Sequence, residues 1–391
     1  MIDFEKYLNT TVKDIPPSGI RRFFDLANEM EGVISLGVGE PDFDTPWHIR
    51  EAGIRSIEEG RTAYTANQGL FSLRKEICQY HERRFNVHYN PKDNIVITVG
   101  GSEAIDIAMR ALINEGDEVI MLSPGYVAYE PSIRLAKGTP KLIELKRENE
   151  FKLTPEALEA TITDKTKVML INFPSNPTGG VMTYEDYQKI VPIIKKHEIL
   201  VISDEIYAEL SYDQPFASLA NFPEVKDQII VINGFSKAFA MTGWRLGYVL
   251  AHKTLTQAMN KIHQYVIMSA PTASQYAAVE AMRHGQQDVQ VMRESYLARR
   301  NFIVNGFNKL GLDTFTPQGA FYVFPCIKST GLSSDEFCEA LLASQKVACV
   351  PGSAFGKAGE GFIRVSYAYS IEHIKEALIR IEAFLNELKN K

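Results

Sequence analysis

Short apolar runs alternate with helix-like stretches between about residues 95 and 250, and this alternation constrains the fold more than any other feature of the sequence. The runs have the length of buried strands and cover residues 94–99, 118–122, 167–172, 199–203 and 229–232. Repeated strand–helix units form mainly parallel sheets with helices on both faces. We therefore predict an α/β fold with a largely parallel sheet.

Reactive side chains follow the last of these runs, in the stretch VINGFSKAFAMTGWRLG at residues 231–247. Ligands of open α/β sheets bind beyond the carboxyl ends of the strands, where this stretch delivers Ser236, Lys237 and Arg245. A lysine there can form a Schiff base with a carbonyl group, and serine and arginine can hold a phosphate. The alternative, a solvated lysine in a surface loop, is left open by this stretch alone.

A pair of glycines precedes a predicted helix and suggests an anion site. Gly100, Gly101 and Ser102 connect the run at 94–99 to a helix predicted over 103–113. Free amides and the helix dipole favour an anion at such a helix start. Many strand–helix turns carry two glycines, but together with Ser236 and Arg245 the pattern predicts a phosphate site.

Four further polar or aromatic residues lie where a ligand could contact them. Asp204 follows the run at 199–203, Tyr126 follows the run at 118–122, and Asn176 lies in the rigid turn PSNPTG. A buried carboxylate needs a partner, but Asp204 could instead cap a helix. Tyr126 could stack on a flat ring or simply pack, and Arg364, in FIRVSYA, could face a ligand or solvent.

Several function classes are disfavoured by the sequence. Gly37 and Gly39 lack the third glycine and the helix of a dinucleotide fingerprint, and residues 352–357 do not have P-loop spacing. The net charge of -6 gives no basic stripe for nucleic acid, and none of the eight histidines has zinc-ligand spacing, so we predict no metal site. Scattered cysteines, a polar N-terminus and the lack of a membrane-length apolar run predict a cytoplasmic protein.

The motif S-K-x-x-x-M-T-G-W-R-L-G at 236–247 resembles the Schiff-base signature of fold-type I pyridoxal-phosphate aminotransferases. From about Gly19 to about residue 385 the chain is similar to the bacterial branch that includes aspartate, alanine and aromatic aminotransferases. This resemblance implies a large cofactor domain at 46–285, and a smaller α+β domain at 1–45 plus 286–391. It also implies a homodimer with shared active sites.

The resemblance assigns roles to individual residues. It implies that Lys237, Asp204 and Tyr207 are catalytic, with Asp204 facing the ring nitrogen and Tyr207 bonding the ring's 3-hydroxyl oxygen. The implied cofactor-binding residues are Tyr64 (from the neighbouring subunit), Gly101, Ser102, Tyr126, Asn176, Asp204, Tyr207, Ser236, Lys237 and Arg245. The implied substrate-binding residues are Gly39, Asn176 and Arg364, with Arg364 clamping the α-carboxylate.

The implied activity is ping-pong transamination between an L-amino acid (alanine, aromatic or aspartate) and a 2-oxo acid such as 2-oxoglutarate. A pyridoxal-phosphate-dependent carbon–sulfur β-lyase remains the main alternative, because it would use the same Lys237 and Asp204. Regulators that fuse this domain to a helix-turn-helix would need sequence before residue 19, and a Rossmann dehydrogenase would need the missing fingerprint. No residue identifies the preferred donor.

The remaining pattern predicts the outer elements. Residues up to about Pro17 resemble a loose arm, followed by a helix over 20–31. One long helix is expected from Ser274 to about Leu310, joining the two domains. Beyond it we predict strands at 321–324, 348–350 and 361–366 and helices at 334–344 and 371–388.

Overall fold

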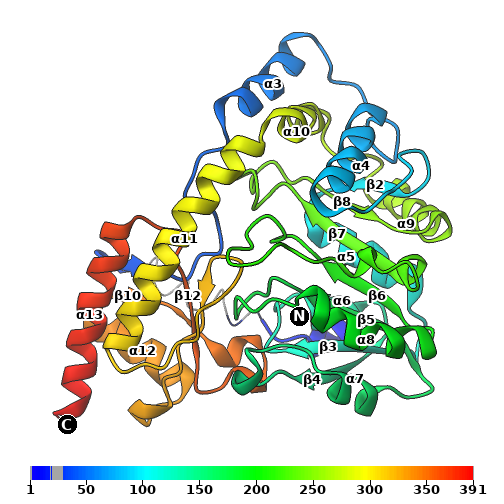
Figure 1. Cartoon of the computed structure of the whole chain (residues 1–391). Helices are drawn as coiled ribbons and strands as arrows, with labels where there is room; N and C mark the ends of the chain where they lie inside the picture. Colours follow the sequence, from blue (N-terminus) through cyan, green and yellow to red (C-terminus); the bar gives the residue numbers. More distant parts are fainter. Residues whose placement is uncertain (1, 18, 20–29, 391) are drawn as a thin grey trace.

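The computed structural model describes residues 2–17, 19 and 30–390, and the helix predicted over 20–31 lies almost entirely outside these residues. A seven-stranded sheet forms the larger part of the molecule, in the order β2-β8-β7-β6-β5-β3-β4 (Figure 1). Its strands are β2 (Ile95–Thr98), β3 (Glu118–Ser123), β4 (Thr139–Glu144), β5 (Thr166–Asn172), β6 (Leu200–Asp204), β7 (Ile229–Gly234) and β8 (Gly247–Leu250). Only β8 runs antiparallel to its neighbours, so the predicted largely parallel sheet is confirmed.

Helices cover both faces of this sheet, because alternate side chains of each strand point to opposite faces. In β3, Val119 and Met121 pack with α5 (Gly100–Leu112), α6 (Tyr129–Leu135) and α9 (Lys253–Val266). Ile120 and Leu122 belong instead to the core on the other face. That core includes α3 (Trp47–Glu58), α4 (Phe71–Phe85), α7 (Pro155–Thr161), α8 (Tyr184–Lys196) and α10 (Thr272–His284).

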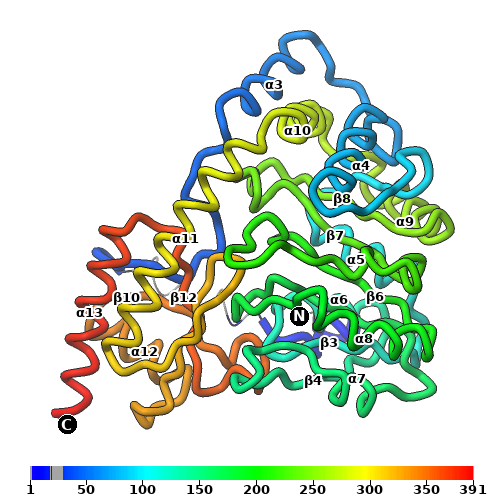
Figure 2. The backbone as a smooth tube through the Cα atoms, in the orientation of Figure 1, coloured from blue at the N-terminus to red at the C-terminus, as the bar shows by residue number. Residues whose placement is uncertain are grey.

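A second, smaller body has its own core beside the large sheet. It contains α11 (Gln286–Lys309), α12 (Ser334–Gln345) and α13 (Ile371–Lys389) around two small sheets. One sheet pairs β1 (Ile34–Ser35) with β10 (Val347–Ala348), and the other has the order β11 (Val350–Pro351), β12 (Ile363–Ser366), β9 (Tyr322–Val323). In Figure 2 the segment between β1 and α3 leads away from this C-terminal body, where β1 pairs with β10. Residues 10–14, near the N-terminus, contact α6 of the larger body instead.

Three predictions about the outer elements are wrong. The single helix predicted from Ser274 to about Leu310 is two helices, because the chain bends at Gly285, where an added Cβ would lie 2.7 Å from the Ala281 carbonyl oxygen. The strand predicted at 348–350 divides between β10 and β11, which belong to different sheets. The loose arm contains η1 (Phe4–Tyr7) and α1 (Thr10–Asp14).

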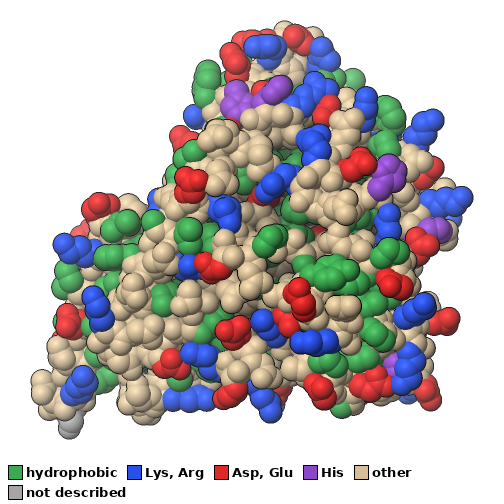
Figure 3. Space-filling model, viewed as in Figure 1, with side chains coloured by type: hydrophobic (Ala, Val, Ile, Leu, Met, Phe, Trp, Pro, Cys, Tyr) green, Lys and Arg blue, Asp and Glu red, His purple; other side chains and the backbone are tan. Residues whose placement is uncertain are grey.

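The remaining described elements are short 3-10 helices: η2 (Arg147–Asn149), η3 (Leu219–Asn221), η4 (Lys226–Gln228), η5 (Lys328–Thr330), η6 (Gly352–Phe355) and η7 (Lys357–Gly359). On the face shown in Figure 3, acidic and basic side chains are interspersed. Within the described parts of the chain, no helix combines the length and the apolar character that a membrane crossing requires.

Candidate active site

A cavity of about 900 Å³ opens beyond the carboxyl ends of β5, β6 and β7, between the large sheet and the smaller body. Eleven of the twelve predicted site residues line it: Gly39, Gly101, Ser102, Tyr126, Asn176, Asp204, Tyr207, Ser236, Lys237, Arg245 and Arg364. The outermost of them, Gly39 and Arg364, lie more than 300 residues apart in the sequence. Most of the others follow the ends of strands in the large sheet, and Arg364 lies in β12.

Lys237 projects into this cavity from the turn after β7. Its Nζ donates a hydrogen bond to the Gly39 carbonyl oxygen at 2.7 Å. Burial lowers the pKa of the Lys237 amine to about 8, an effect that the Glu40 carboxylate opposes. The guanidinium groups of Arg364 and Arg245 lower this pKa further. Near pH 8 about half of the amine is therefore neutral and nucleophilic.

Asp204 is the last residue of β6, and its carboxylate is buried. Oδ2 accepts a hydrogen bond from the Tyr129 hydroxyl at 2.6 Å, and Oδ1 accepts one from the Ile206 amide at 3.2 Å. Burial raises the pKa of Asp204 to about 6, although both hydrogen bonds oppose the shift. Residues 206–209 form a turn and no helix follows directly, so Asp204 does not cap a helix. In the described structure no cationic side chain lies within ion-pair distance of the Asp204 carboxylate. Because this carboxylate lines the cavity, it is suited to pair with a cationic atom of a ligand.

Arg364 points inward from β12 and is 3% exposed, so the outward orientation considered above is wrong. Its Nη1 donates to Asn176 Oδ1 at 3.0 Å, and its Nη2 donates to the Gly37 carbonyl oxygen at 2.5 Å. Its Nε has no hydrogen-bond partner, and no carboxylate from residues 2–17, 19 or 30–390 forms an ion pair with it. A buried guanidinium of this kind is well suited to bind a carboxylate through two parallel hydrogen bonds.

The start of α5 offers backbone amides to the same cavity. Gly100 has φ +74°, and an added Cβ would lie 2.7 Å from Nη2 of Arg245, so glycine permits the close approach of this arginine. Gly101 and Ser102 occupy the first turn, whose amides have no partner inside the helix. With the neighbouring Ser236, these groups form a site suited to a phosphate.

Tyr129, Asn172 and Tyr322 are among the lining residues of the cavity that were not predicted from the sequence. Asn172 donates from Nδ2 to the Asp204 carbonyl oxygen at 2.9 Å and accepts from the Asn176 amide at 2.9 Å. The Tyr322 hydroxyl lies 2.9 Å from the Tyr207 hydroxyl, and its ring centroid lies 4.6 Å from the Arg364 guanidinium carbon. Tyr322 stands in an apolar run that resembles ordinary core, whereas Asn172 could have been identified as a polar residue at a strand end.

The two predicted aromatic residues differ in position. Tyr126 lines the cavity and packs edge-on against Tyr129, with ring centroids 5.4 Å apart. Tyr64 is the one predicted site residue outside the cavity lining, and it is 80% exposed. Its predicted contact involves a neighbouring subunit, so its position in a single chain does not test that prediction.

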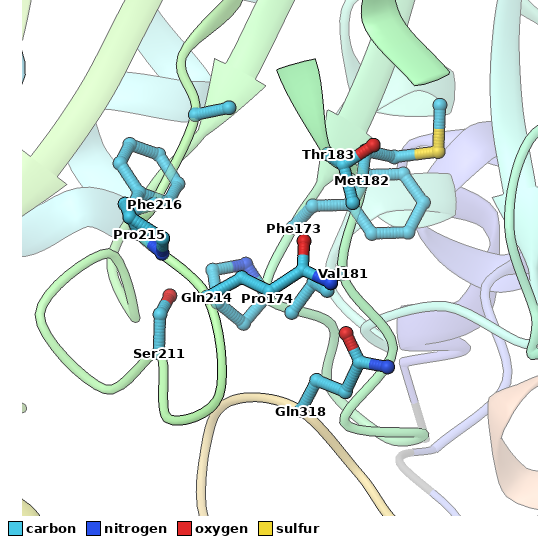
Figure 4. A pocket seen from close by; sticks show the side chains of 11 residues that line it. Phe173, Pro174, Val181, Met182, Thr183, Ser211, Gln214, Pro215, Phe216 and Gln318 are labelled. Atoms are coloured by element: carbon cyan, nitrogen blue, oxygen red, sulfur yellow. The ribbon is translucent and has the colours of Figure 1, made fainter. Parts of the chain in front are cut away.

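A second pocket lies near the large cavity but differs in its chemistry. It has a volume of about 10 Å³ and lies between Phe173, Phe216 and Gln318 (Figure 4). No side chain among its lining residues is acidic or basic, so the pocket offers no charged group to a ligand. Elsewhere in the described residues, no cluster of three histidine, cysteine or acidic side chains is arranged to hold a metal.

Comparisons with known proteins cover nearly the whole chain. The family described as aminotransferase class I and II matches residues 31–381. A Bacillus subtilis protein whose name includes the word aminotransferase is 53% identical over 97% of this chain and 99% of its own length. The aspartate aminotransferase of Pyrococcus abyssi is 43% identical over 96% of this chain and 97% of its own.

A solved structure gives the same result for the fold. The aromatic aminotransferase from Pyrococcus horikoshii has a TM-score of 0.90 and 40% identity, over 95% of this chain and 99% of that chain. Each of these relatives is named as an aminotransferase, and none is named as a carbon–sulfur lyase.

Proposed function

This chain belongs to the class I and II aminotransferases, and we propose that it uses pyridoxal phosphate to move an amino group from an L-amino acid to a 2-oxo acid. One observation supports the choice of this cavity as the active site. It places an amine with a lowered pKa, Lys237, together with a buried guanidinium that lacks a counterion, Arg364. An amino acid needs both groups, one for its α-carbon proton and one for its carboxylate.

The protein's own residues would carry out most of the reaction. When bound, pyridoxal phosphate supplies an electron sink for the substrate's α-carbon. Lys237 would bind the cofactor's aldehyde carbon and, once displaced by substrate, would take the proton from the α-carbon. Asp204 would keep the ring nitrogen protonated, and Tyr207 would donate to the 3-hydroxyl oxygen.

The other predicted residues would hold the cofactor and the substrate. Gly101, Ser102, Ser236 and Arg245 would hold the phosphate at the start of α5. Tyr126 would stack on the ring, and Asn176 would contact the ring hydroxyl and the substrate carboxylate. Arg364 would clamp that carboxylate beside Gly39, where only glycine fits because an added Cβ would overlap the Tyr322 hydroxyl.

Replacing Arg364 with lysine should mainly weaken substrate binding. Lysine keeps the charge but loses the planar pair of donors, so we expect kcat/KM to fall about 100-fold, chiefly through KM. Steady-state kinetics at varied amino-acid concentration measures this. The control is Arg380→Lys, which changes a half-buried arginine paired with Glu376 on α13. A KM within about threefold of wild type would remove Arg364 from carboxylate binding.

The lowered pKa of Lys237 predicts how cofactor binding depends on pH. Only the neutral amine attacks an aldehyde, so the rate of covalent pyridoxal-phosphate binding by cofactor-free protein should rise up to about pH 8 and then level off. An ordinary lysine would continue to gain rate towards its usual pKa near 10.4. Stopped-flow absorbance measures the rate, with Nα-acetyl-lysine amide as the reference amine. A protein profile that parallels the reference would contradict the lowered pKa.

The visible spectrum of the purified protein tests the function directly. Alanine, aspartate, glutamate, phenylalanine and cystathionine are added one at a time. Bleaching to the pyridoxamine form identifies the transaminase half-reaction, and the donors that bleach fastest identify the substrate class. Ammonia released from cystathionine without bleaching would indicate the lyase instead. If no cofactor band appears even after pyridoxal phosphate is added, the proposal is wrong.

We propose that the enzyme is a cytoplasmic homodimer with shared active sites, and that its domains span 46–285 and 1–45 plus 286–391. An exposed apolar stretch lies close to the segment of Tyr64: the Asn67 side chain donates to the Met268 carbonyl oxygen, and Tyr265, Val266, Ile267 and Met268 are all exposed. A partner subunit would cover this surface and bring Tyr64 to its phosphate. Sedimentation should give the mass of two chains, and a single-chain mass would contradict the shared site.

A further inference from the structure

The segment between β1 and α3 presents two backbone carbonyls to the active site. The Gly37 carbonyl oxygen accepts from Nη2 of Arg364 at 2.5 Å, and the Gly39 carbonyl oxygen accepts from Nζ of Lys237 at 2.7 Å. The placement of this segment therefore helps to set the position of both cations.

The backbone of this segment has little support of its own. Pro41 has no N–H to donate, and residues 37–45 make no backbone-to-backbone hydrogen bond with any part of the chain that the structure describes. The segment is tied at its two ends. At one end the Leu36 amide donates to the Ala348 carbonyl oxygen at 2.8 Å, and at the other the Thr45 hydroxyl donates to the Ala240 carbonyl oxygen at 2.6 Å.

Between these ends, the segment is anchored by Arg299 of α11. Nη1 of Arg299 donates to Asp42 Oδ1 at 2.7 Å, and this ion pair is largely buried, with the arginine side chain 11% exposed. The guanidinium carbon also lies 5.2 Å from the ring centroid of Phe43 and 5.5 Å from that of Tyr296. One arginine thus holds two consecutive residues of the segment, three and four residues beyond Gly39.

We propose that Arg299 is a positioning residue for the substrate's α-carboxylate: it fixes residues 37–45, and thereby the Gly37 carbonyl that orients Arg364. This inference rests on the proposed function. Arg299 does not line the cavity, so its effect must pass through the segment. Without the ion pair, Asp42 loses its partner and the segment loses its central support. Small displacements of binding groups are enough to weaken productive binding.

Arg299→Met tests this proposal, with Arg300→Met as the matched control. Arg300 is the next residue of α11, is also buried, and pairs with Asp213 at 2.5 Å, but it does not contact residues 37–45. We expect Arg299→Met to raise the KM for the amino acid about 10-fold with kcat within about threefold of wild type. Arg300→Met should change KM less than about twofold, and Arg299→Lys should fall between Arg299→Met and wild type.

A second variant keeps the test decisive if Arg299→Met does not fold, as judged by circular dichroism. Asp42→Asn keeps the shape of the side chain and removes its charge, and it should raise KM about threefold to fivefold. Equal KM values for the Arg299 and Arg300 variants would overturn the proposal, because they would reflect general loosening of α11. An unchanged KM in Asp42→Asn would overturn it as well. An inactive wild type would overturn the proposed function, whereas an active wild type with an unchanged Arg299→Met overturns the role of Arg299 alone.

Discussion

Replacing Lys237 with alanine should lower kcat at least about 10⁴-fold, because the change removes both the covalent bond to the cofactor and the group that moves the α-carbon proton. The protein should still fold, since the side chain is only partly buried and its one hydrogen bond is to a backbone carbonyl. It should also still bind pyridoxal phosphate without a covalent bond, through Asp204 and the phosphate site. Turnover assays, together with the absorbance of the dialysed protein, measure both effects.

Lys226→Ala is the matched control for this variant. Lys226 is also half-buried and donates from Nζ to a backbone carbonyl oxygen, that of His88, at 2.6 Å, but it lies outside the cavity. We expect this variant to keep wild-type kcat. Partial recovery of Lys237→Ala by added methylamine would support a proton-transfer role for the lost amine. Sustained turnover above about one per cent of wild type, without added amine, would remove Lys237 from the mechanism.

Replacing Asp204 with asparagine should lower kcat about 10³-fold. A charge pair at ~4 Å with an effective dielectric of ~20 contributes about 4 kcal/mol, which corresponds to roughly that factor in rate. Asparagine keeps the shape of the side chain and one acceptor oxygen for the Ile206 amide, and its Nδ2 can donate to the Tyr129 hydroxyl oxygen, so the loss reports the charge more than the shape. Asp204→Ala, which also loses these hydrogen bonds, should be nearly inactive.

The control for the charge change is Asp213→Asn, which alters a carboxylate that pairs with Arg300 outside the cavity. Its kcat should stay within about threefold of wild type. The pH dependence of the bound chromophore gives a second readout: the ring nitrogen should lose its proton at lower pH in Asp204→Asn than in wild type. Activity of Asp204→Asn close to wild type would refute the electron-sink role of the carboxylate.

The sequence was sufficient for five of the seven strands of the large sheet and for most of the site, because these depend on local pattern. Lys237 and Asp204 follow apolar runs, and the ends of parallel strands meet at one edge of a sheet, so their proximity follows from the fold. The strand β4 was missed because it lies at the sheet edge, where side chains of Thr139 and Glu144 are exposed and the run is less apolar. Predicting α11 as part of one long helix failed because the bend depends on packing around Gly285.

The direction in which a side chain points was the property that could not be predicted from the sequence. An arginine in a strand can face either side, and the inward direction of Arg364 depends on the pairing of β12 with β11 and β9. Tyr322 looked like core because it lies among phenylalanines, and only the fold brings its hydroxyl to Tyr207. The contact between Arg299 and Asp42 joins residues far apart in the sequence, so no local pattern predicts it.

The pairing of β1 with β10 has a consequence for biosynthesis. More than 300 residues separate Ser35 from Val347, and ribosomes add about 5–20 residues per second, so the N-terminal strand waits roughly 15 to 60 s for its partner. During that interval the segment carrying Gly37 and Gly39 has no sheet to join. The large sheet can complete itself well before then, and the substrate side of the active site is among the last parts of the nascent protein to form.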